Sequence, residues 1–235
     1  MSVAIDTTFD VYSDTREGMD PDSHSPTLRR YHQTLWSKPL PDGSSFELSV
    51  DHPKTYLYHK SQRGEFFLSS DSVGHTYRNV KAMAPIISEV PTEELDQFFS
   101  VCSTIGGYVV FPSRKIEGKR TINGARGLHW KIKDRFDLTL ECIRLHYQGH
   151  ESPLSADLAR YSNFFDLFGS FKGYVDFFLL QDLVSEGGAA IEFFIPFSSF
   201  DAAPLPAGLK EYHSYRESVV AFVAARNRRI ASQAA

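Results

Sequence analysis

Apolar residues recur at three- and four-residue intervals along much of the chain, which predicts a protein built mainly of helices. The clearest of these stripes predicts a helix over 131–148 that ends before Gly149. Its inward positions are Ile132, Phe136, Leu140, Ile143 and Tyr147. We therefore expect this helix to be central and buried.

Weaker stripes predict further helices, and two of these have clear start signals. Ser25-Pro26 and Ser152-Pro153 each place a capping serine before a proline at the first helical position. The predicted ranges are 26–36, 91–105, 152–165, 171–179 and 209–231. The inward positions of the second of these are Leu95, Phe98, Phe99 and Cys102.

Short segments with strand character separate the helices. They lie at 46–50, 55–59, 65–69, 108–111 and 189–197. Gln62-Arg63-Gly64 predicts a hairpin between the second and third of them. The strands are too few and too unevenly spaced for a doubly wound sheet or a sandwich. We expect an α+β fold, a helix-dominated single domain over 1–235 with a small, mainly antiparallel sheet.

The first 24 residues differ from the rest, because they are rich in Asp, Ser and Thr and have little apolar periodicity. We expect 1–24 to form an irregular arm on the surface. Elsewhere the chain has an ordinary hydrophobic content of 42%, and no apolar run is long enough to span a bilayer. We therefore expect a cytoplasmic protein without a membrane partner, in which Cys102 and Cys142 are reduced core thiols.

Charge is unevenly distributed, although the formal net charge of −4 gives no general argument for nucleic-acid binding. Nine cations lie between 113 and 147, and among them Gly124-Ala125-Arg126-Gly127 precedes the predicted central helix. Flanking glycines allow positive φ angles and close backbone approach, and a helix start attracts anions. The candidate anion-binding residues are Arg120, Asn123, Arg126, His129 and Arg135, with help from Lys119.

Other interpretations of these residues remain open. Arg126 could instead pair internally with Asp134 or Glu141, and Asp137 with Glu141 could supply an acid–base pair. Ser69-Ser70-Asp71-Ser72 and His75 contain the residue types of a Ser/His/Asp triad, but no nucleophile elbow surrounds any serine, so turn chemistry is the simpler explanation. The histidines are scattered, and we expect no metal site and no cofactor.

Several blocks of sequence together resemble a bacterial family of uncharacterised proteins, a domain of unknown function. The blocks are 25–32, 35–40, 64–72, 121–127, 134–144 and 173–183. The resemblance spans most of residues 9–200 and implies a bacterial, single-domain, intracellular protein. It implies no activity and no catalytic residues.

Three functions follow as hypotheses. The first is a binding or regulatory module for a phosphate-bearing ligand, a nucleotide or a nucleic-acid backbone, held by Arg126. The second is a nucleic-acid- or nucleotide-directed enzyme, such as a toxin or phage-defence effector, that uses His129 or carboxylates beside the same arginines. The third is a structural or interaction protein with the arginines as internal ion pairs. Burial of Arg126 and Arg135 against carboxylates would favour the third. The sequence leaves the oligomeric state open.

Overall fold

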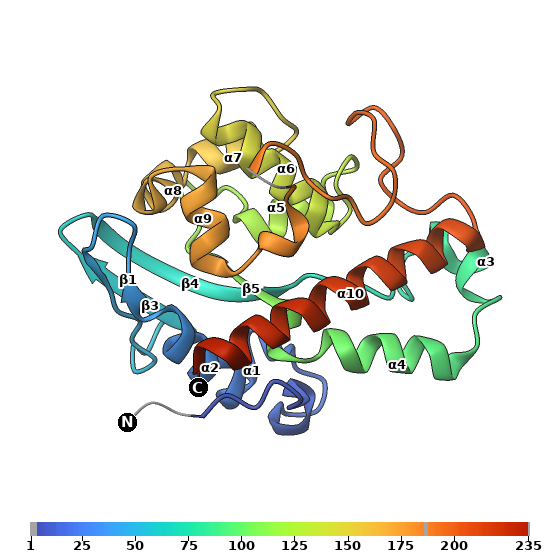
Figure 1. The fold of residues 1–235 in the computed structure, drawn as a ribbon, viewed down its shortest axis with the longest axis horizontal. Coiled ribbons are helices and arrows are strands. Elements are labelled where there is room, and N and C mark those ends of the chain that lie inside the picture. Colours follow the sequence, from blue (N-terminus) through green and yellow to red (C-terminus); the bar gives the residue numbers. More distant parts are fainter. Residues whose placement is uncertain (1–3, 186–187, 235) are drawn as a thin grey trace.

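A curved, three-stranded antiparallel sheet lies between two groups of helices in the computed structural model, which describes residues 4–185 and 188–234 (Figure 1). The strand order is β3 (Leu57–Ser61), β4 (Gly64–Ser72) and β5 (Tyr108–Pro112). Ser61 pairs with Gly64, so the predicted hairpin is confirmed. A second, two-stranded sheet joins β1 (Lys38–Pro39) to β2 (Ser45–Phe46). The α+β class predicted from the sequence is correct.

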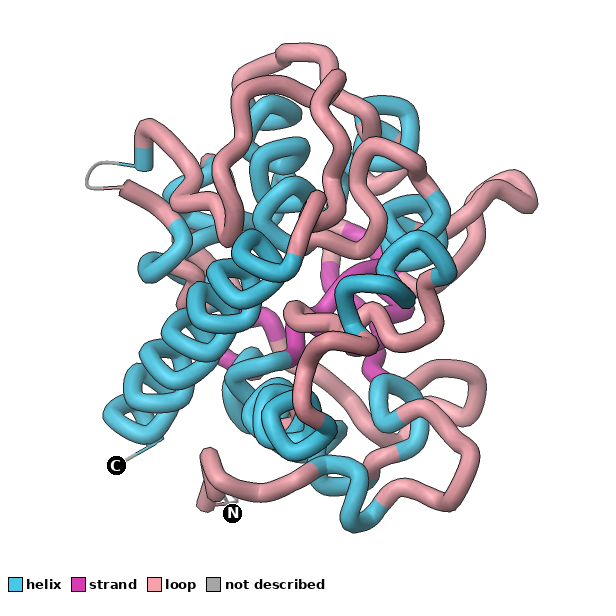
Figure 2. Tube along the Cα trace, turned by 90° about the vertical axis from the view of Figure 1, so that its right-hand side faces the viewer, coloured by secondary structure: helices cyan, strands magenta, loops and turns pink. Residues whose placement is uncertain are grey.

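Helices cover both faces of the larger sheet. On one side lie α5 (Ile122–Leu128), α6 (Phe136–Tyr147), α7 (Ser155–Ala159), α8 (Ser162–Phe165) and α9 (Phe171–Phe178). On the other side lie α1 (Pro21–His24) and α2 (Pro26–Trp36). The long α10 (Leu209–Ala234) packs along α4 (Thr92–Cys102), and α3 (Ala84–Ile87) lies near its start. Figure 2 shows the strands enclosed by these helices and their loops.

Single turns of 3-10 helix complete the element list. They are η1 (Val11–Asp14), η2 (Lys81–Met83), η3 (Ile105–Gly107), η4 (Asp166–Phe168) and η5 (Gln181–Leu183). The helices predicted at 26–36 and 209–231 are confirmed as α2 and α10. Ser25 caps α2 as predicted, because its side chain accepts a hydrogen bond from the Leu28 N–H.

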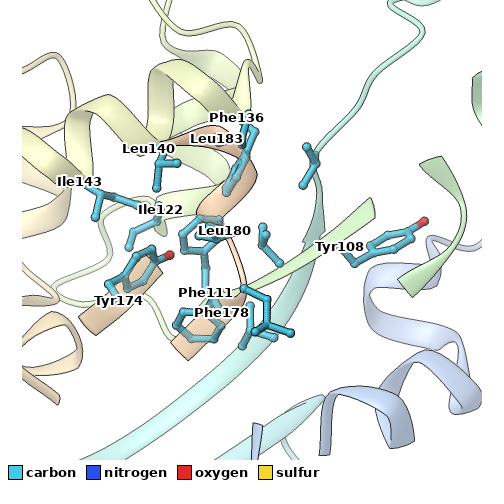
Figure 3. Packing of buried hydrophobic residues seen from close by; sticks show 14 of the residues in the cluster. Tyr108, Phe111, Ile122, Phe136, Leu140, Ile143, Tyr174, Phe178, Leu180 and Leu183 are labelled. Atoms are coloured by element: carbon cyan, nitrogen blue, oxygen red, sulfur yellow. The ribbon is translucent and has the colours of Figure 1, made fainter. Parts of the chain in front are cut away.

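The core centres on β5, all of whose residues are buried. Figure 3 shows Phe111 of β5 facing side chains of α6 and α9 across the core. Phe136, Leu140 and Ile143 of α6 are all fully buried, so the predicted stripe is confirmed. The predicted start at 131 is wrong, because Lys133 and Asp134 have positive φ angles of 49° and 62°, which a helix does not allow. The helix therefore begins at Phe136.

Three other predictions about elements are wrong. The helix expected at 152–165 is divided into α7 and α8. The strand expected at 189–197 has only one bridge among its described residues, and the Phe194 N–H bonds to the Asp137 carboxylate instead of to a strand. Phe99, expected to face inward, is 38% exposed and contacts the ring of Tyr12.

The segment expected as an irregular arm contains η1 and α1 within its described residues. Val11 is completely buried, and its N–H donates to the Ser103 carbonyl at 3.0 Å. The Asp14 carboxylate accepts hydrogen bonds from the Ser25 hydroxyl and the Thr27 N–H, at 2.6 and 2.8 Å. Local acidic side chains thus act as caps, so this segment contributes to the core despite its weak apolar periodicity.

Candidate functional site

The glycine-bracketed arginine lies inside α5 instead of preceding a helix. Gly124 and Gly127 are helical residues, and neither has the positive φ that the anion-binding interpretation requires. Thr121 caps the helix by accepting a hydrogen bond from the Gly124 N–H. Gly127 has a different role, because a Cβ atom there would lie 3.0 Å from a carboxylate oxygen of Asp134. The glycine therefore lets this carboxylate approach the helix.

Arg126 has no exposed surface and makes its hydrogen bonds to protein acceptors. Its Nη1 atom donates to Asp71 Oδ2 at 2.6 Å, its Nη2 atom to the Asp134 carbonyl at 2.8 Å, and its Nε atom to Thr139 Oγ1 at 3.1 Å. Asp134 Oδ1 also lies 3.6 Å from Nη1. Burial lowers the pKa of Arg126, but the two carboxylates outweigh this effect and raise the pKa above its usual value.

The internal pairing of Arg126 is the alternative that the sequence left open. Of the two expected partners, Asp134 is confirmed, whereas Glu141 forms a two-pronged pair with Arg144. The main partner, Asp71, was not expected. It lies near the end of β4, 55 residues away along the chain.

A third carboxyl group, that of Asp22 in α1, interacts electrostatically with Asp71 and Arg126, and α1 packs against β4. Its inner oxygen Oδ1 is enclosed and has no hydrogen-bond partner among the described residues. Burial is the largest cause that raises the pKa of Asp22 well above its usual value, and the carboxylates of Asp71 and Asp20 add to it. Arg126 opposes the shift without cancelling it. Asp22 is therefore a carboxylic acid that tends to keep its proton.

Two further polar side chains border this group. His75 Nε2 lies 3.3 Å from the Ser72 hydroxyl, and burial lowers the pKa of the imidazole, which therefore favours the neutral form. Asn123 donates to the Ser70 carbonyl at 3.1 Å, and its Oδ1 is enclosed without a partner in the described part of the chain. We call the residues Asp22, Asp71, His75, Arg126 and Asp134 the Arg126 cluster.

The Arg126 cluster is not sealed from solvent. The Asp71 side chain is 13% exposed and that of Asp134 is 34% exposed, whereas Arg126 is fully covered. Its members come from α1, β4, the loop after β4, α5 and the loop before α6. The fold thus gathers, from distant parts of the chain, a carboxyl group with a raised pKa and ion-paired carboxylates with access to water.

Arg135 belongs to a different place. It forms a two-pronged pair with Asp137 and donates to the Pro204 carbonyl at 3.0 Å. Both side chains of the pair are almost completely buried. Because Asp137 also accepts the Phe194 N–H at 2.9 Å, this pair anchors the segment between α9 and α10 and has no free donor directed to solvent. Asp137 does not combine with Glu141, which is paired elsewhere.

Arg120 and His129 flank α5, one before its first turn and the other directly after its last residue. Arg120 is exposed, and its carbonyl accepts a hydrogen bond from Arg160 at 3.1 Å. His129 lines a hollow of about 390 Å³ together with Trp130, which is 62% exposed. Burial lowers the pKa of His129, and the nearby Asp157 partly offsets this. The five residues predicted to bind one anion are therefore not gathered in one place. Arg126 and Asn123 lie in or beside the Arg126 cluster, and Arg135 is paired with Asp137 in the interior. Arg120 is exposed, and His129 lines the hollow beside Trp130.

Little in the sequence points to Asp22 and Asp71. Asp22 stands among many acids in the N-terminal segment, so its position beside Arg126 has no local signal. Asp71 and His75 have the residue types of a triad, but their local sequence is also typical of turns. What could have singled them out is a contact between β4 and α5, which a single sequence does not reveal.

The family of unknown function DUF6994 matches residues 5–230 of the chain. No curated protein and no solved structure matches this chain. Within the described residues, no helix is both long enough and apolar enough to cross a membrane.

Proposed function

From the premise that this chain belongs to the DUF6994 family, whose function is unknown, we propose that it is an enzyme that performs general acid–base chemistry at the Arg126 cluster. Asp22 is the acid and Asp71 is the base. The observation that carries the proposal is the Asp22 oxygen Oδ1, which is enclosed and has no hydrogen-bond partner among the described residues, in a residue that interacts electrostatically with the Arg126–Asp71 pair. This assignment uses carboxylates beside Arg126, as the second hypothesis from the sequence did, but different ones.

Two carboxyl groups with opposite protonation preferences are what acid–base catalysis requires. A group that keeps its proton near neutral pH can donate it to a leaving group, while an ionised neighbour accepts one from water. Burial and nearby carboxylates hold the pKa of Asp22 high. The Arg126 guanidinium contacts the Asp71 carboxylate at 2.6 Å. An enclosed carboxyl oxygen without a hydrogen-bond partner is costly for stability, which supports a catalytic role.

The proposal is tested with a panel of 4-nitrophenyl esters, phosphodiesters and glycosides, assayed over pH 4–9. We expect the wild-type protein to cleave at least one class with a bell-shaped pH profile. Asp22→Asn and Asp71→Asn should each lower that rate by about 10²–10⁴-fold. The matched control is Asp166→Asn, because Asp166 is exposed and lies outside the Arg126 cluster. Equal rates in the wild type and both cluster variants would refute the proposal.

A phosphate-bearing ligand remains the second candidate, now on the outer side of α5. Trp130 and Leu128 are the most exposed large apolar side chains of the described residues, at 62% and 64%. Lys119 and Arg120 are exposed and form no ion pair within the described chain. The Lys131 ammonium lies 5.0 Å from the centre of the Trp130 ring, and an exposed aromatic ring beside a cation suits a nucleotide base and its phosphate.

Tryptophan fluorescence tests this second candidate, because Trp36 is completely buried and Trp130 is exposed. A nucleotide or a short oligonucleotide that stacks on Trp130 should quench the exposed component and lose its effect as salt rises. Trp130→Phe should abolish the change. Quenching that persists in this variant would place the ligand elsewhere.

We further propose a cytoplasmic, bacterial protein, as the sequence predicts. The free, buried thiols of Cys102 and Cys142 support a reducing compartment, because disulfides form mainly in oxidising ones.

A further inference from the structure

A hollow outside the Arg126 cluster lies between α4 and α10, which pack side by side (Figure 1). Its volume is about 430 Å³, within the range of about 300–1,000 Å³ that is usual for small-molecule sites. It shares no lining residue with the Arg126 cluster or with the hollow beside Trp130. A ligand held there is therefore separate from both functions proposed above.

Arg216 of α10 brings a largely buried positive charge to this hollow, because its side chain is only 9% exposed. Its Nη2 atom donates to Glu94 Oε2 at 2.7 Å and to His213 Nδ1 at 2.6 Å. A guanidinium group only donates, so His213 accepts on Nδ1 and carries no proton there. Among the described residues, neither Nε nor Nη1 of Arg216 has a hydrogen-bond partner, and of these two atoms only Nε is enclosed. Nη1 is therefore free to donate to a ligand.

The unused donors of Arg216 indicate that an acceptor is missing. Buried polar groups in native proteins are nearly always hydrogen-bonded, and leaving one unpaired costs stability. Carboxylate and phosphate groups are the acceptors whose geometry suits a guanidinium group. The hollow thus favours a ligand with one of these two groups.

The other charges around the hollow decide between these two anions. Glu94 already pairs with Arg216, and Glu217 also lines the hollow but forms no ion pair within the described chain. A phosphate group would bring up to two negative charges to a place where two carboxylates already face one guanidinium group, so they would repel it. A carboxylate ligand that also carries an ammonium group adds no net charge, and its ammonium group can pair with Glu217.

Apolar side chains form much of the remaining wall. Phe98 is buried, and Val101 and Val220 are half-buried. An apolar group packed against them would leave water, which favours binding. The hollow therefore offers a donor for a carboxylate, a partner for an ammonium group and an apolar surface.

We propose that this hollow binds a free α-amino acid with an apolar side chain. The α-carboxylate accepts hydrogen bonds from Arg216 Nη1, and the α-ammonium group lies beside Glu217. The apolar side chain packs against Val101 and Val220. Because the ligand contacts both α4 and α10, its binding should also raise the melting temperature of the protein.

Calorimetry of the full-length protein at pH 7 tests the proposal with L-valine, L-leucine, L-isoleucine, L-methionine and L-phenylalanine. For the amino acid that binds most tightly, the N-acetyl derivative removes the ammonium group and the amide derivative removes the carboxylate. We expect at least one amino acid to bind and both of its derivatives to bind at least about tenfold more weakly, because each loses one ion pair. No binding by any member of the panel would overturn the proposal. An N-acetyl derivative that binds as tightly as its parent would also overturn it and would indicate the C-terminus of a peptide instead.

Variants of the full-length protein then locate the bound amino acid. Glu217→Gln should weaken binding at least about tenfold and leave the melting temperature of the free protein nearly unchanged, because Glu217 is exposed. Val220→Trp fills the hollow and should abolish binding. The matched control is Glu93→Gln, which removes an exposed glutamate of α4 that does not line the hollow and should bind like the wild type. Arg216→Ala should also abolish binding, and if it fails to fold, Glu217→Gln still decides the question. Wild-type affinity in Glu217→Gln would overturn the proposal.

Discussion

Three arginines are completely or almost completely buried, and each meets the cost of burial in a different way. Arg126 pairs mainly with Asp71, and Arg135 pairs with Asp137. Arg226 has no carboxylate partner among the described residues; it donates to the carbonyls of Gly106, Tyr108 and Phe178 and lies over the Trp36 ring. Burial lowers its pKa to about 9. These side chains join segments that are far apart in sequence, as the third hypothesis from the sequence supposed.

Replacing Arg126 with Ala should destabilise the protein strongly. The change strands the Asp71 and Asp134 carboxylates beside Asp22, and breaking a buried pair costs about 3–5 kcal/mol. Urea unfolding at pH 7 measures the loss. Arg120→Ala, which removes an exposed cation from the same region, should change stability by less than about 0.5 kcal/mol. Similar stabilities for the two variants would show that Arg126 is not a structural residue.

Asp22→Asn should have the opposite effect, and the effect should depend on pH. The raised pKa means that the folded state holds the Asp22 proton more tightly than the unfolded state. The wild type therefore loses stability as the pH rises from the ordinary aspartate range, about 3.9, through the raised folded-state pKa. We expect the variant to melt at a higher temperature than the wild type at pH 7–8 and at a similar temperature below pH 4. A lower melting temperature at pH 7 would contradict this account.

At this scale the sequence predicted Arg126 and its pairing with Asp134, but not the role of the other members of the Arg126 cluster. The position of Arg126 among glycines was informative, although Gly127 makes room for a carboxylate and not for an anion from solution. The partner Asp71 and the opposing Asp22 lie on elements that meet Arg126 only in the folded chain. No periodicity or spacing in the sequence connects Asp71 or Asp22 with Arg126. Only the folded structure shows that these distant segments meet.

At the scale of elements, local signals were decisive where they existed. The helix at 26–36 has a serine cap and a proline at its first position, and both of its ends were predicted correctly. The 189–197 segment is rich in apolar and aromatic residues, but it forms only one bridge, between Ile191 and Val184, and its Phe193 and Phe197 rings pack against each other with centres 4.5 Å apart. Apolar and aromatic residues form a strand only if the fold supplies a partner.

The central helix allows a direct test of the core. Leu140 of α6 is completely buried, and Leu140→Ala should cost roughly 2–5 kcal/mol. Leu128→Ala is the matched control, because Leu128 ends α5 with 64% of its surface exposed. Its effect should stay within about 0.5 kcal/mol. Guanidinium unfolding of both variants compares them. A small loss for Leu140→Ala would show that α6 is not a core helix.

At the scale of the whole molecule, the N-terminal segment is part of the domain. Val11 is buried against the end of α4, Asp14 caps α2, and Asp22 reaches the Arg126 cluster. The weak apolar pattern hid this, because single side chains and caps make the contacts instead of an amphipathic stripe.

Deleting residues 1–24 should therefore destabilise the domain clearly. Loss of the buried Val11 side chain and of the Asp14 cap together costs roughly 2–5 kcal/mol. Differential scanning calorimetry of the shortened chain would show a lower melting temperature and a smaller unfolding enthalpy. An unchanged transition would restore the interpretation of this segment as a surface arm.

Among the described residues, Arg226 donates its hydrogen bonds to backbone carbonyl groups, and this has a consequence for biosynthesis. The three peptide groups that it joins belong to η3, β5 and the end of α9, all of which leave the ribosome before α10 does. Until Arg226 emerges, these carbonyls lack their final partner, and the apolar surfaces that α10 covers remain open. A nascent chain that lacks its last helix therefore exposes apolar surface, which makes such species prone to aggregate.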